Sequence, residues 1–356
     1  MKRFAAIDLF AGAGGMSLGA VRAGMRVALA VERDPNAART YAANHRGTAV
    51  FSNDIRRLTP RRIRAVGSKG RTKIVFGGPP CQGFSYSNVR TRSAENADNW
   101  LFLEFIRVVR LWKPDWVVFE NVKGIADTAG GVFVDHVVEQ LEELGYAMAH
   151  GLLNAKDFGV PQDRARFFLI GCRTGIRPRL PRPSRRKSPT VAQAISDLPV
   201  LDNGASVSWI PYGDALPSYY ARRLRNGKGK CPNHLVTRNC ELVIRRYSHI
   251  PPGGNWENIP ARLMRNYADR MRCHTGIYHR LRANRRSVVI GNFRKNMLIH
   301  PTQDRGLSVR EAARIQSFPD DYEFHGSIGF QQQQVGNAVP PLLAEAVFKA
   351  IIAAAN

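Results

Sequence analysis

The stretch Gly77-Gly78-Pro79-Pro80-Cys81-Gln82-Gly83-Phe84-Ser85 decides the fold. It follows the short apolar run 73–76, which predicts a buried strand. The glycines and prolines end this strand abruptly and stiffen the turn after it. Cys81 therefore stands on a rigid turn, whereas a structural cysteine packs inside an apolar run. This placement is typical of a nucleophile aimed at a cleft. The alternative is a tight turn whose cysteine is incidental.

A glycine-rich turn near the N-terminus indicates a nucleotide site. Residues 4–10 have the pattern of a buried strand, and a helical stretch follows Asp8-Leu9-Phe10-Ala11-Gly12-Ala13-Gly14-Gly15. Glycines in such a turn let the backbone approach a ligand and let the helix pack close to the strand. The glycine spacing differs from that of dehydrogenases, and a plain tight turn is the alternative.

Two acidic residues strengthen the nucleotide interpretation. Glu32 ends the second predicted strand, 27–31, about 20 positions after the glycines, where a carboxylate is placed to hold ribose hydroxyls. Asp54 follows the third predicted strand, 48–51, and is placed to accept a hydrogen bond from an adenine amino group. Together they predict a cofactor that contains adenosine.

Three more charged side chains adjoin predicted strands. Glu120 follows the apolar run 116–119, so we expect a partly buried carboxyl at the same sheet edge as Cys81. Ligands bind at this edge, where parallel strands end. Arg164 and Arg166 precede an apolar strand, and their alternation would direct them to one side. Solvent-exposed charge is the alternative for all three.

At this point the chain resembles the DNA (cytosine-5)-methyltransferases of bacterial restriction-modification systems. The matching segments follow the family's order and cover residues 1–171 and 301–356. They are Asp8-Leu9-Phe10-Ala11-Gly12-x-Gly14-Gly15, Glu32, Asn53-Asp54-Ile55, Pro79-Pro80-Cys81-Gln82-Gly83-Phe84-Ser85, Glu120-Asn121-Val122, Gln162-x-Arg164-x-Arg166, Arg310-Glu311-Ala312-Ala313-Arg314-Ile315-Gln316-Ser317-Phe318-Pro319 and Gln334-Val335-Gly336-Asn337-Ala338-Val339-Pro340-Pro341.

The resemblance implies roles for four catalytic residues. Cys81 would add to carbon-6 of cytosine as a thiolate, which makes carbon-5 nucleophilic. Glu120 would bond to ring nitrogen N3 and the exocyclic amine, while Arg166, together with Arg164, would hold O2 and the nucleophile side of the ring. The target base would be flipped out of the duplex, and the loop 82–99 would close over the DNA.

The resemblance also implies S-adenosylmethionine as the methyl donor. The positions that match the family's cofactor residues are Phe10, Gly12, Gly14, Glu32, Asp54, Ile55, Pro79, Asn337 and Val339. The implied fold is α/β, a Rossmann-like methyltransferase sheet with a second, smaller and irregular target-recognition domain. We expect residues 1–172 and 301–356 to form a discontinuous catalytic domain, and residues 173–300 to form the target-recognition domain.

Positive charge is concentrated in the second predicted domain. Residues 173–301 hold 25 Lys and Arg against 6 Asp and Glu, a net charge of 25 − 6 = +19 out of +25 for the chain. Such an excess favours a nucleic-acid partner, here double-stranded DNA. One predicted DNA-contacting loop carries Arg222, Arg223, Arg225, Lys228 and Lys230.

One segment departs from the family pattern. Ser287-Val288-Val289-Ile290 stands where relatives often carry Pro-Thr followed by Ile, Leu or Val, so valine replaces a hydroxyl near the flipped-base site. Cys231, His234, Cys240 and the pair Cys273-His274 do not have the spacing of a common zinc module, and we expect no metal.

The remaining expectations concern context. Five cysteines without a disulfide-like pattern and the absence of a long apolar run predict a cytoplasmic protein. We expect a monomer, with a cognate restriction endonuclease as a possible partner. Two other functions stay open at this stage, a transfer-RNA cytosine-5 methyltransferase and a non-catalytic DNA-binding regulator.

Overall fold

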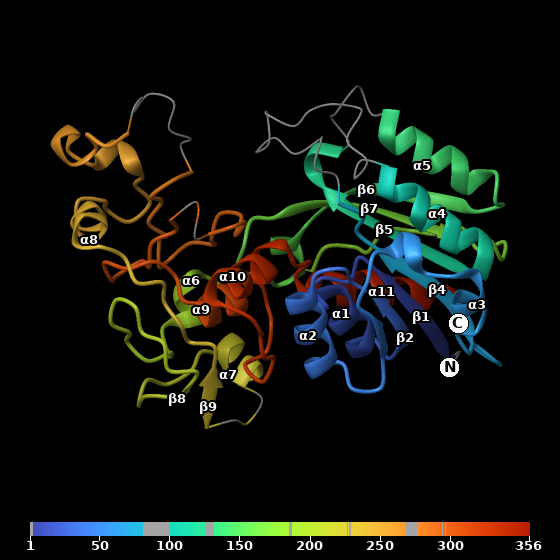
Figure 1. Ribbon diagram of the computed structural model, residues 1–356, viewed down its shortest axis with the longest axis horizontal. Coiled ribbons are helices and arrows are strands. Elements are labelled where there is room, and N and C mark those ends of the chain that lie inside the picture. The colour runs from blue at the N-terminus through green and yellow to red at the C-terminus, as the bar shows by residue number, and fades with distance from the viewer. Residues whose placement is uncertain are drawn as a thin grey trace. The chain divides into compact units, whose positions relative to one another are not determined.

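The computed structural model describes residues 3–80, 100–125, 132–184, 187–225, 227, 229–267, 276–293, 295 and 297–356. The chain divides into two compact units (Figure 1). The first, which we call the sheet unit, comprises Met1–Phe158, Ala165–Arg185 and Val339–Asn356. The second unit comprises Gly159–Arg164 and Arg186–Ala338. We describe each unit by itself.

A seven-stranded sheet forms the centre of the sheet unit, in the order β3-β2-β1-β4-β5-β7-β6. The first five strands are parallel, while β7 pairs antiparallel with both β5 and β6. The chain therefore enters β1 in the middle and winds outward in both directions, the doubly wound arrangement whose ligands lie beyond the carboxyl ends of the strands. The strands are β1 (Phe4–Leu9), β2 (Arg26–Val31), β3 (Ala49–Phe51), β4 (Thr72–Gly77), β5 (Trp116–Val122), β6 (Ala147–Asn154) and β7 (Ala165–Cys172).

Helices cover both faces of this sheet. Side chains of alternating strand positions point to opposite faces, so Phe119 of β5 contacts Phe105 of α4 while Phe76 of β4 contacts Phe348 of α11. Helices α4 and α5 lie on one side of the sheet (Figure 1), and side chains of α3, α4 and α5 share one apolar cluster with the first of these faces. The helices are α1 (Gly15–Arg22), α2 (Pro35–Asn44), α3 (Pro60–Arg64), α4 (Leu101–Trp112), α5 (Val132–Glu142) and α11 (Pro341–Ala355).

Helix α11 packs closely against α1, which follows the glycine turn. A methyl group added to Gly19 of α1 would lie 2.5 Å from the Cβ of Ala344 and 2.6 Å from the backbone nitrogen of Glu345. Only glycine permits this approach. The last helix of the chain thus supports the first strand–turn–helix segment, as the family resemblance implies.

Long-range pairing and two prolines set the ends of two elements. The apolar run 116–119 predicts a strand that ends in Glu120-Asn121-Val122, and β5 extends to Val122 because Glu120, Asn121 and Val122 pair with Phe168, Phe167 and Arg166 of β7. The apolar pattern predicts the final helix over 338–353, which is wrong at its start: Ala338 is extended (φ −62°, ψ 145°) and α11 begins at Pro341. Pro341 disfavours a helical backbone in the residue before it, and its missing N–H is not needed at the first position of a helix. The helix therefore begins readily at Pro341.

The second unit has little regular structure, as predicted. Its two short strands, β8 (Trp209–Pro211) and β9 (Lys230–Pro232), pair antiparallel. Buried arginines organise the rest: Arg314, fully enclosed, forms ion pairs with Asp197 and Asp320. The helices are α6 (Val191–Ile195), α7 (Tyr219–Arg225), α8 (Glu241–Ser248), α9 (Val309–Ile315) and α10 (Ile328–Asn337). The segment Ser308-Val309-Arg310-Glu311 predicts a capped helix start, and α9 begins at this capping box.

The compact units differ in extent from the predicted functional domains. Residues 301–338, assigned by sequence to the catalytic domain, pack within the second unit. The compact units describe packing, whereas the predicted domains describe functions. The bounds of the catalytic and target-recognition domains therefore remain a prediction.

One stretch, Ile328–Ala355, has the length and apolar composition of a membrane span, with 56% of its most apolar window buried. It consists of two helices separated by the extended residues around Pro340, and α11 is a packed core helix.

Candidate active site

The glycine turn after β1 has the geometry of a cofactor cradle. Phe10, Gly12 and Gly14 all have positive φ values, of 58°, 54° and 89°. Glycine adopts this region without strain, whereas Phe10 is held in it by its neighbours. A side chain on Gly12 would meet no atom within 4 Å, so open space lies in front of the turn.

Glu32 closes one side of this turn. Its carboxylate accepts hydrogen bonds from the backbone N–H of Gly12 (2.7 Å) and of Asp34 (2.8 Å). Burial raises the pKa of Glu32, while these two N–H groups oppose the rise. The acidic residue predicted from the sequence is therefore fixed directly beside the predicted glycines.

A buried hydroxyl pair lies behind the turn. Ser17 donates to Asp8 at 2.6 Å, and its oxygen lies 2.6 Å from the Tyr41 hydroxyl. All three side chains are buried, and burial raises the pKa of Asp8 to about 8. The raised pKa favours the protonated acid near neutral pH, and Asp8 helps to join β1, α1 and α2. The sequence analysis gave no role to Ser17 or Tyr41, since single hydroxyls within helices carry no pattern.

Asp54, predicted to accept from adenine, is already engaged in this structure. Its carboxylate accepts from the backbone N–H of Arg56 and forms a two-point ion pair with the Arg56 guanidinium. These contacts lower its pKa to about 2. Ile55, beside it, is buried. The carboxylate is ionised and 26% exposed, so a further donor such as an amino group remains chemically suitable.

Glu120 and Arg166 form the polar centre of the opposite part of the sheet edge. Glu120 lies on β5 and Arg166 on β7, and Arg166 Nε is 3.3 Å from Glu120 Oε1. Both side chains are almost enclosed, with 11% and 12% of their surface exposed. Burial lowers the pKa of Arg166 while Glu120 raises it, and an arginine remains charged at any working pH.

Gly78 provides the space that the Glu120 carboxylate occupies. A methyl group on Gly78 would lie 2.5 Å from Glu120 Oε2. One residue earlier, a methyl group on Gly77 would lie 2.2 Å from the backbone oxygen of Leu9. The two glycines before the prolines therefore serve different purposes, one for the carboxylate and one for the packing of β4 against β1.

Asn121 fixes the turn that leads to the predicted nucleophile. Its side-chain amide donates to the carbonyl oxygen of Pro79 at 3.0 Å, and its carbonyl accepts from the backbone N–H of Val122. Pro79 is buried and precedes Cys81 by two residues. Cys81 itself and the loop 82–99 lie outside the described residues.

Arg164, predicted to contact the target base, bonds to backbone carbonyls. It is buried in the second unit, with 1% of its surface exposed. Its terminal nitrogens donate to the carbonyls of Ile290 (2.6 Å), Gly336 (2.8 Å) and Ala338 (3.1 Å). A guanidinium whose donors bond to backbone carbonyls stabilises the fold. This arrangement therefore gives no support to a contact between Arg164 and the target base.

The remaining predicted residues have mixed outcomes. Asn337 is exposed at the end of α10, and Val339 is buried. Arg225, predicted to contact DNA, is ion-paired with Asp197 and stacks on Tyr212. Arg222, Arg223 and Lys230 are exposed, and Lys228 lies outside the described residues.

The cysteines show no metal-site geometry where they are described. Within those parts of the chain, no group of three or more metal-ligating side chains occurs. Cys231 is buried, and Cys240 is exposed. The Cys273-His274 pair lies outside the described residues.

A doubly wound sheet with this strand order, a glycine cradle backed by an acidic residue, and a Glu–Arg pair at the same edge define a Rossmann-like methyltransferase. The comparisons agree. Residues 4–353 match the family of C-5 cytosine-specific DNA methylases. The chain belongs to this family.

Individual relatives cover nearly the whole chain. The Type II methyltransferase M1.HphI of Haemophilus parahaemolyticus is 38% identical over 97% of this chain and 86% of its own length. M.DdeI of Desulfomicrobium norvegicum is 35% identical, over 97% and 88%. A solved putative DNA modification methyltransferase of an Escherichia coli prophage superimposes with a TM-score of 0.81 at 25% identity, over 99% of both chains.

The family fixes the reaction. The protein is a DNA (cytosine-5)-methyltransferase, and its methyl donor is S-adenosylmethionine. The covalent cysteine adduct and base flipping are general to this family. The family and the fold class that the sequence predicted are thereby confirmed. The roles of individual residues remain predictions.

Proposed function

We propose that Cys81, Glu120 and Arg166 carry out the transfer on a cytosine flipped out of duplex DNA. The Cys81 thiolate forms a bond to carbon-6, which places electron density on carbon-5. With S-adenosylmethionine bound, carbon-5 would form a bond to its methyl group while the bond from that methyl to the sulfonium sulfur breaks, so that S-adenosylhomocysteine leaves. Loss of the carbon-5 proton to a base then restores the ring double bond and expels the thiolate, so atoms and charge balance.

The Glu120–Arg166 pair is the observation that carries this proposal. Glu120 holds the ring through N3 and the exocyclic amine, which offsets the charge that develops when the thiolate attacks. Arg166 holds O2 and orients the Glu120 carboxylate from 3.3 Å. Both groups are nearly enclosed, and such preorganised charges act strongly in a site that excludes water. Gly78 and Asn121 keep the carboxylate and the Cys81 turn in position.

The chemistry of the cradle fits S-adenosylmethionine. When bound, it supplies an electrophilic methyl group. Glu32 offers a carboxylate for ribose hydroxyls, Asp54 an acceptor for the adenine amine, and Gly12 leaves room for the ligand against the backbone. We assign the remaining contacts to Phe10, Gly14, Ile55, Pro79, Asn337 and Val339.

We further propose a biological setting. The relatives named above are Type II methyltransferases, which favours a restriction-modification system with a cognate endonuclease that cuts the same duplex site. A cytoplasmic monomer suits this role, because the substrate is chromosomal DNA and the net charge of +25 favours DNA over a second copy of the chain.

Genome-wide methylation mapping tests the proposal. The wild type and Cys81→Ser are expressed in a bacterial host without cytosine-5 methylation. We expect methyl groups at carbon-5 of one cytosine within a short recurring motif for the wild type, and none for the variant. Methylation of transfer RNA instead of DNA would contradict the DNA role, and methylation by soluble Cys81→Ser would contradict the role of the cysteine.

A further inference from the structure

The segment 279–282 of the second unit is held from two sides. On one side, Gly253 N–H donates to the carbonyl of Arg280 (2.8 Å), and Arg280 N–H donates to the carbonyl of Gly254 (3.1 Å). On the other side, Leu281 N–H donates to Ile299, and Ile299 N–H donates to His279. Backbone bonded on both edges is rigid, so a side chain that leaves this segment starts from a fixed point.

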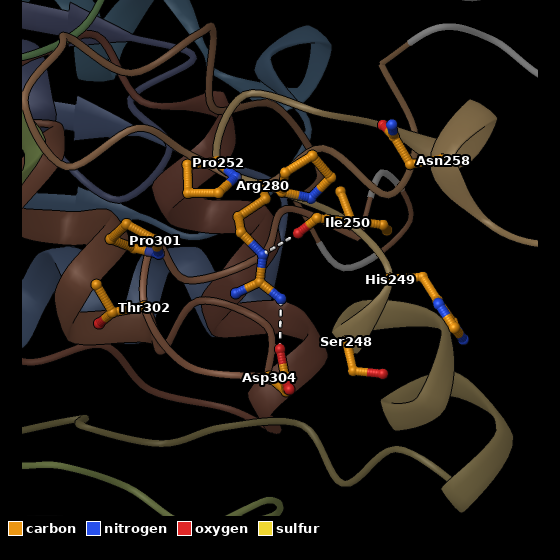
Figure 2. Close-up of a pocket in the computed structure, with 10 residues that line it drawn as sticks. Ser248, His249, Ile250, Pro252, Asn258, Arg280, Pro301, Thr302 and Asp304 are labelled. Atoms are coloured by element: carbon orange, nitrogen blue, oxygen red, sulfur yellow. Dashed lines mark hydrogen bonds and ion pairs between the residues drawn. The ribbon is translucent and has the colours of Figure 1, made fainter.

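Arg280 is the internal anchor of this segment. Figure 2 shows its guanidinium at the wall of a pocket of about 570 Å³, with bonds to the Ile250 carbonyl and to Asp304. Its other donors reach the carbonyls of Tyr247, His300 and Gln303. An arginine has five N–H donors, and all five are used. Arg280 therefore builds the scaffold and has no donor left for a ligand in this pocket.

Arg282, two residues later, is the opposite case. It is exposed, and no hydrogen bond or ion pair engages its guanidinium within the described ranges. It nevertheless has a defined position, because it lies against Gly253. A methyl group on Gly253 would be 2.0 Å from Arg282 Nε and 2.8 Å from Cζ and Nη2. Gly253 has φ +86°, a backbone conformation that favours glycine, and its lack of a side chain leaves the space that the Arg282 guanidinium occupies.

The turn after Arg282 is fixed as well. Arg285 N–H donates back to the carbonyl of Arg282 (3.3 Å), and the first N–H groups of α6 donate to the carbonyls of Ala283 and Arg285. Ser287 then pairs with the segment 161–163, through Ser287 N–H to Pro161 and Asp163 N–H to Ser287. Along the chain, Asp163 is three residues from Arg166, the arginine proposed to hold the target cytosine.

We propose that Arg282 is a specificity-determining residue that reads a guanine in the recognition sequence through the major groove. The planar guanidinium bonds to guanine O6 and N7 with two parallel N–H groups, which is the commonest specific contact between a side chain and a base. The contact with Gly253 limits the motion of the Arg282 side chain and so reduces the entropy lost on binding. This favours a contact with a base over a non-specific contact with phosphate. Among the residues that the structure describes, no carboxylate forms an ion pair with this arginine.

Arg285 provides the matched comparison. It is exposed on the same turn and carries the same charge, but its side chain does not lie against a glycine. We assign it a phosphate contact, which positions the protein and carries no sequence information. The proposal rests on the established methylation of DNA. It assigns a base contact to Arg282 and a phosphate contact to Arg285.

The experiment uses duplex DNA with randomised bases around a cytosine, methylated briefly by the full-length protein and then sequenced for 5-methylcytosine. The variants are Arg282→Ala, Arg282→Lys and Arg285→Ala. Arg282→Lys keeps the charge but removes the two-pronged donor. Thermal melting checks that each variant is folded.

We expect both Arg282 variants to lose the preference for guanine at one position by roughly 5- to 150-fold, with the other positions unchanged. Arg285→Ala should keep every preference and lower methylation of all sequences alike. Arg282 variants that lose activity equally on every sequence, that keep every preference, or that relax a position other than guanine would overturn the proposal. Because the wild type is measured on the same library, a failure of the methylation reaction itself is seen separately.

Discussion

At the scale of single residues, two arginines one position apart have different environments. Arg164 donates to three backbone carbonyls inside the second unit, whereas Arg166 faces the Glu120 carboxylate. Sequence alternation suggested one shared role. The difference arises because the chain passes from one compact unit to the other between residues 164 and 165.

This contrast leads to a paired prediction. Arg164→Lys loses the fork that reaches three carbonyls, and buried carbonyls without donors are costly, so we expect the variant to be destabilised by about 3 kcal/mol. Arg166→Lys should melt like the wild type but transfer methyl groups roughly 100-fold more slowly, because the contact acts on developing charge. Differential scanning fluorimetry and single-turnover methylation separate the two. The opposite pattern, an inactive but stable Arg164→Lys, would restore Arg164 to the catalytic set.

The buried Asp8 gives a prediction for pH. Its pKa rises from 3.8 in the unfolded chain to about 8 in the fold, so the folded protein keeps a proton that the unfolded chain releases. The contribution of Asp8 to stability is therefore complete below pH 3.8 and is lost as the pH rises toward 8. Asn has the shape of the protonated acid and does not titrate.

We therefore expect the stability of Asp8→Asn, relative to the wild type, to increase steadily from pH 5 to pH 8. Urea unfolding at several pH values measures this difference directly. Ser17→Ala serves as the comparison, because it removes the hydroxyl that donates to Asp8 but leaves the carboxyl to titrate. A constant difference between Asp8→Asn and the wild type across this range would show that Asp8 is ionised in the fold.

At the scale of elements, the end of β4 is the feature on which the active site depends. Gly77 and Gly78 are adjacent, yet an added methyl group would meet a rigid backbone oxygen in the first case and the mobile end of a side chain in the second. A backbone atom cannot move away without shifting its strand, whereas the Glu120 carboxylate can rotate. Similar substitutions should therefore have different consequences.

We expect Gly78→Ala to fold normally and to lose about 100-fold in the rate of methyl transfer, since displacing a catalytic group by about 1 Å has effects of this size. Gly77→Ala should instead lower the melting temperature, because β4 can no longer pack against β1. Binding of S-adenosylmethionine by calorimetry should survive in Gly78→Ala. A fully active Gly78→Ala would indicate that Glu120 does not need its present position.

Local sequence patterns predicted these elements well. The sequence predicts a helix over 35–44, and α2 has these bounds because Asp34 caps it and Pro35 occupies its first position. The pairing of Glu120, Asn121 and Val122 with β7 is long-range, and no local pattern reveals this partner. The contact of Asn121 with Pro79 escaped prediction for the same reason.

At the scale of the whole molecule, the sequence identified the family and the sheet but not the environment of each charge. Arg222, Arg223 and Arg225 are indistinguishable in a sequence, yet Arg225 is held by Asp197 while the other two are exposed. In a chain with 53 Lys and Arg, part of the positive charge is structural. The net charge of +25 therefore overstates the number of cations that reach DNA.

The salt dependence of DNA binding measures how many cations make that contact. Each phosphate neutralised by an exposed Lys or Arg releases counterions, so the logarithm of affinity should fall linearly with the logarithm of salt concentration, by about 0.9 per contact. Six to ten contacts would reduce affinity by about 10³- to 10⁵-fold between about 50 and 200 mM salt. Fluorescence anisotropy on a duplex that contains the recognition site gives this slope.

Two double variants assign the slope to a region of the chain. Arg222→Ser with Arg223→Ser removes two exposed cations of α7, and we expect the slope to become shallower by about 1.8. Arg61→Ser with Arg64→Ser removes two exposed cations of α3, which lies outside the basic stretch 173–301, and the slope should not change. If the α3 pair alone alters the slope, DNA is bound through the sheet unit, and the concentration of charge in residues 173–301 serves another purpose.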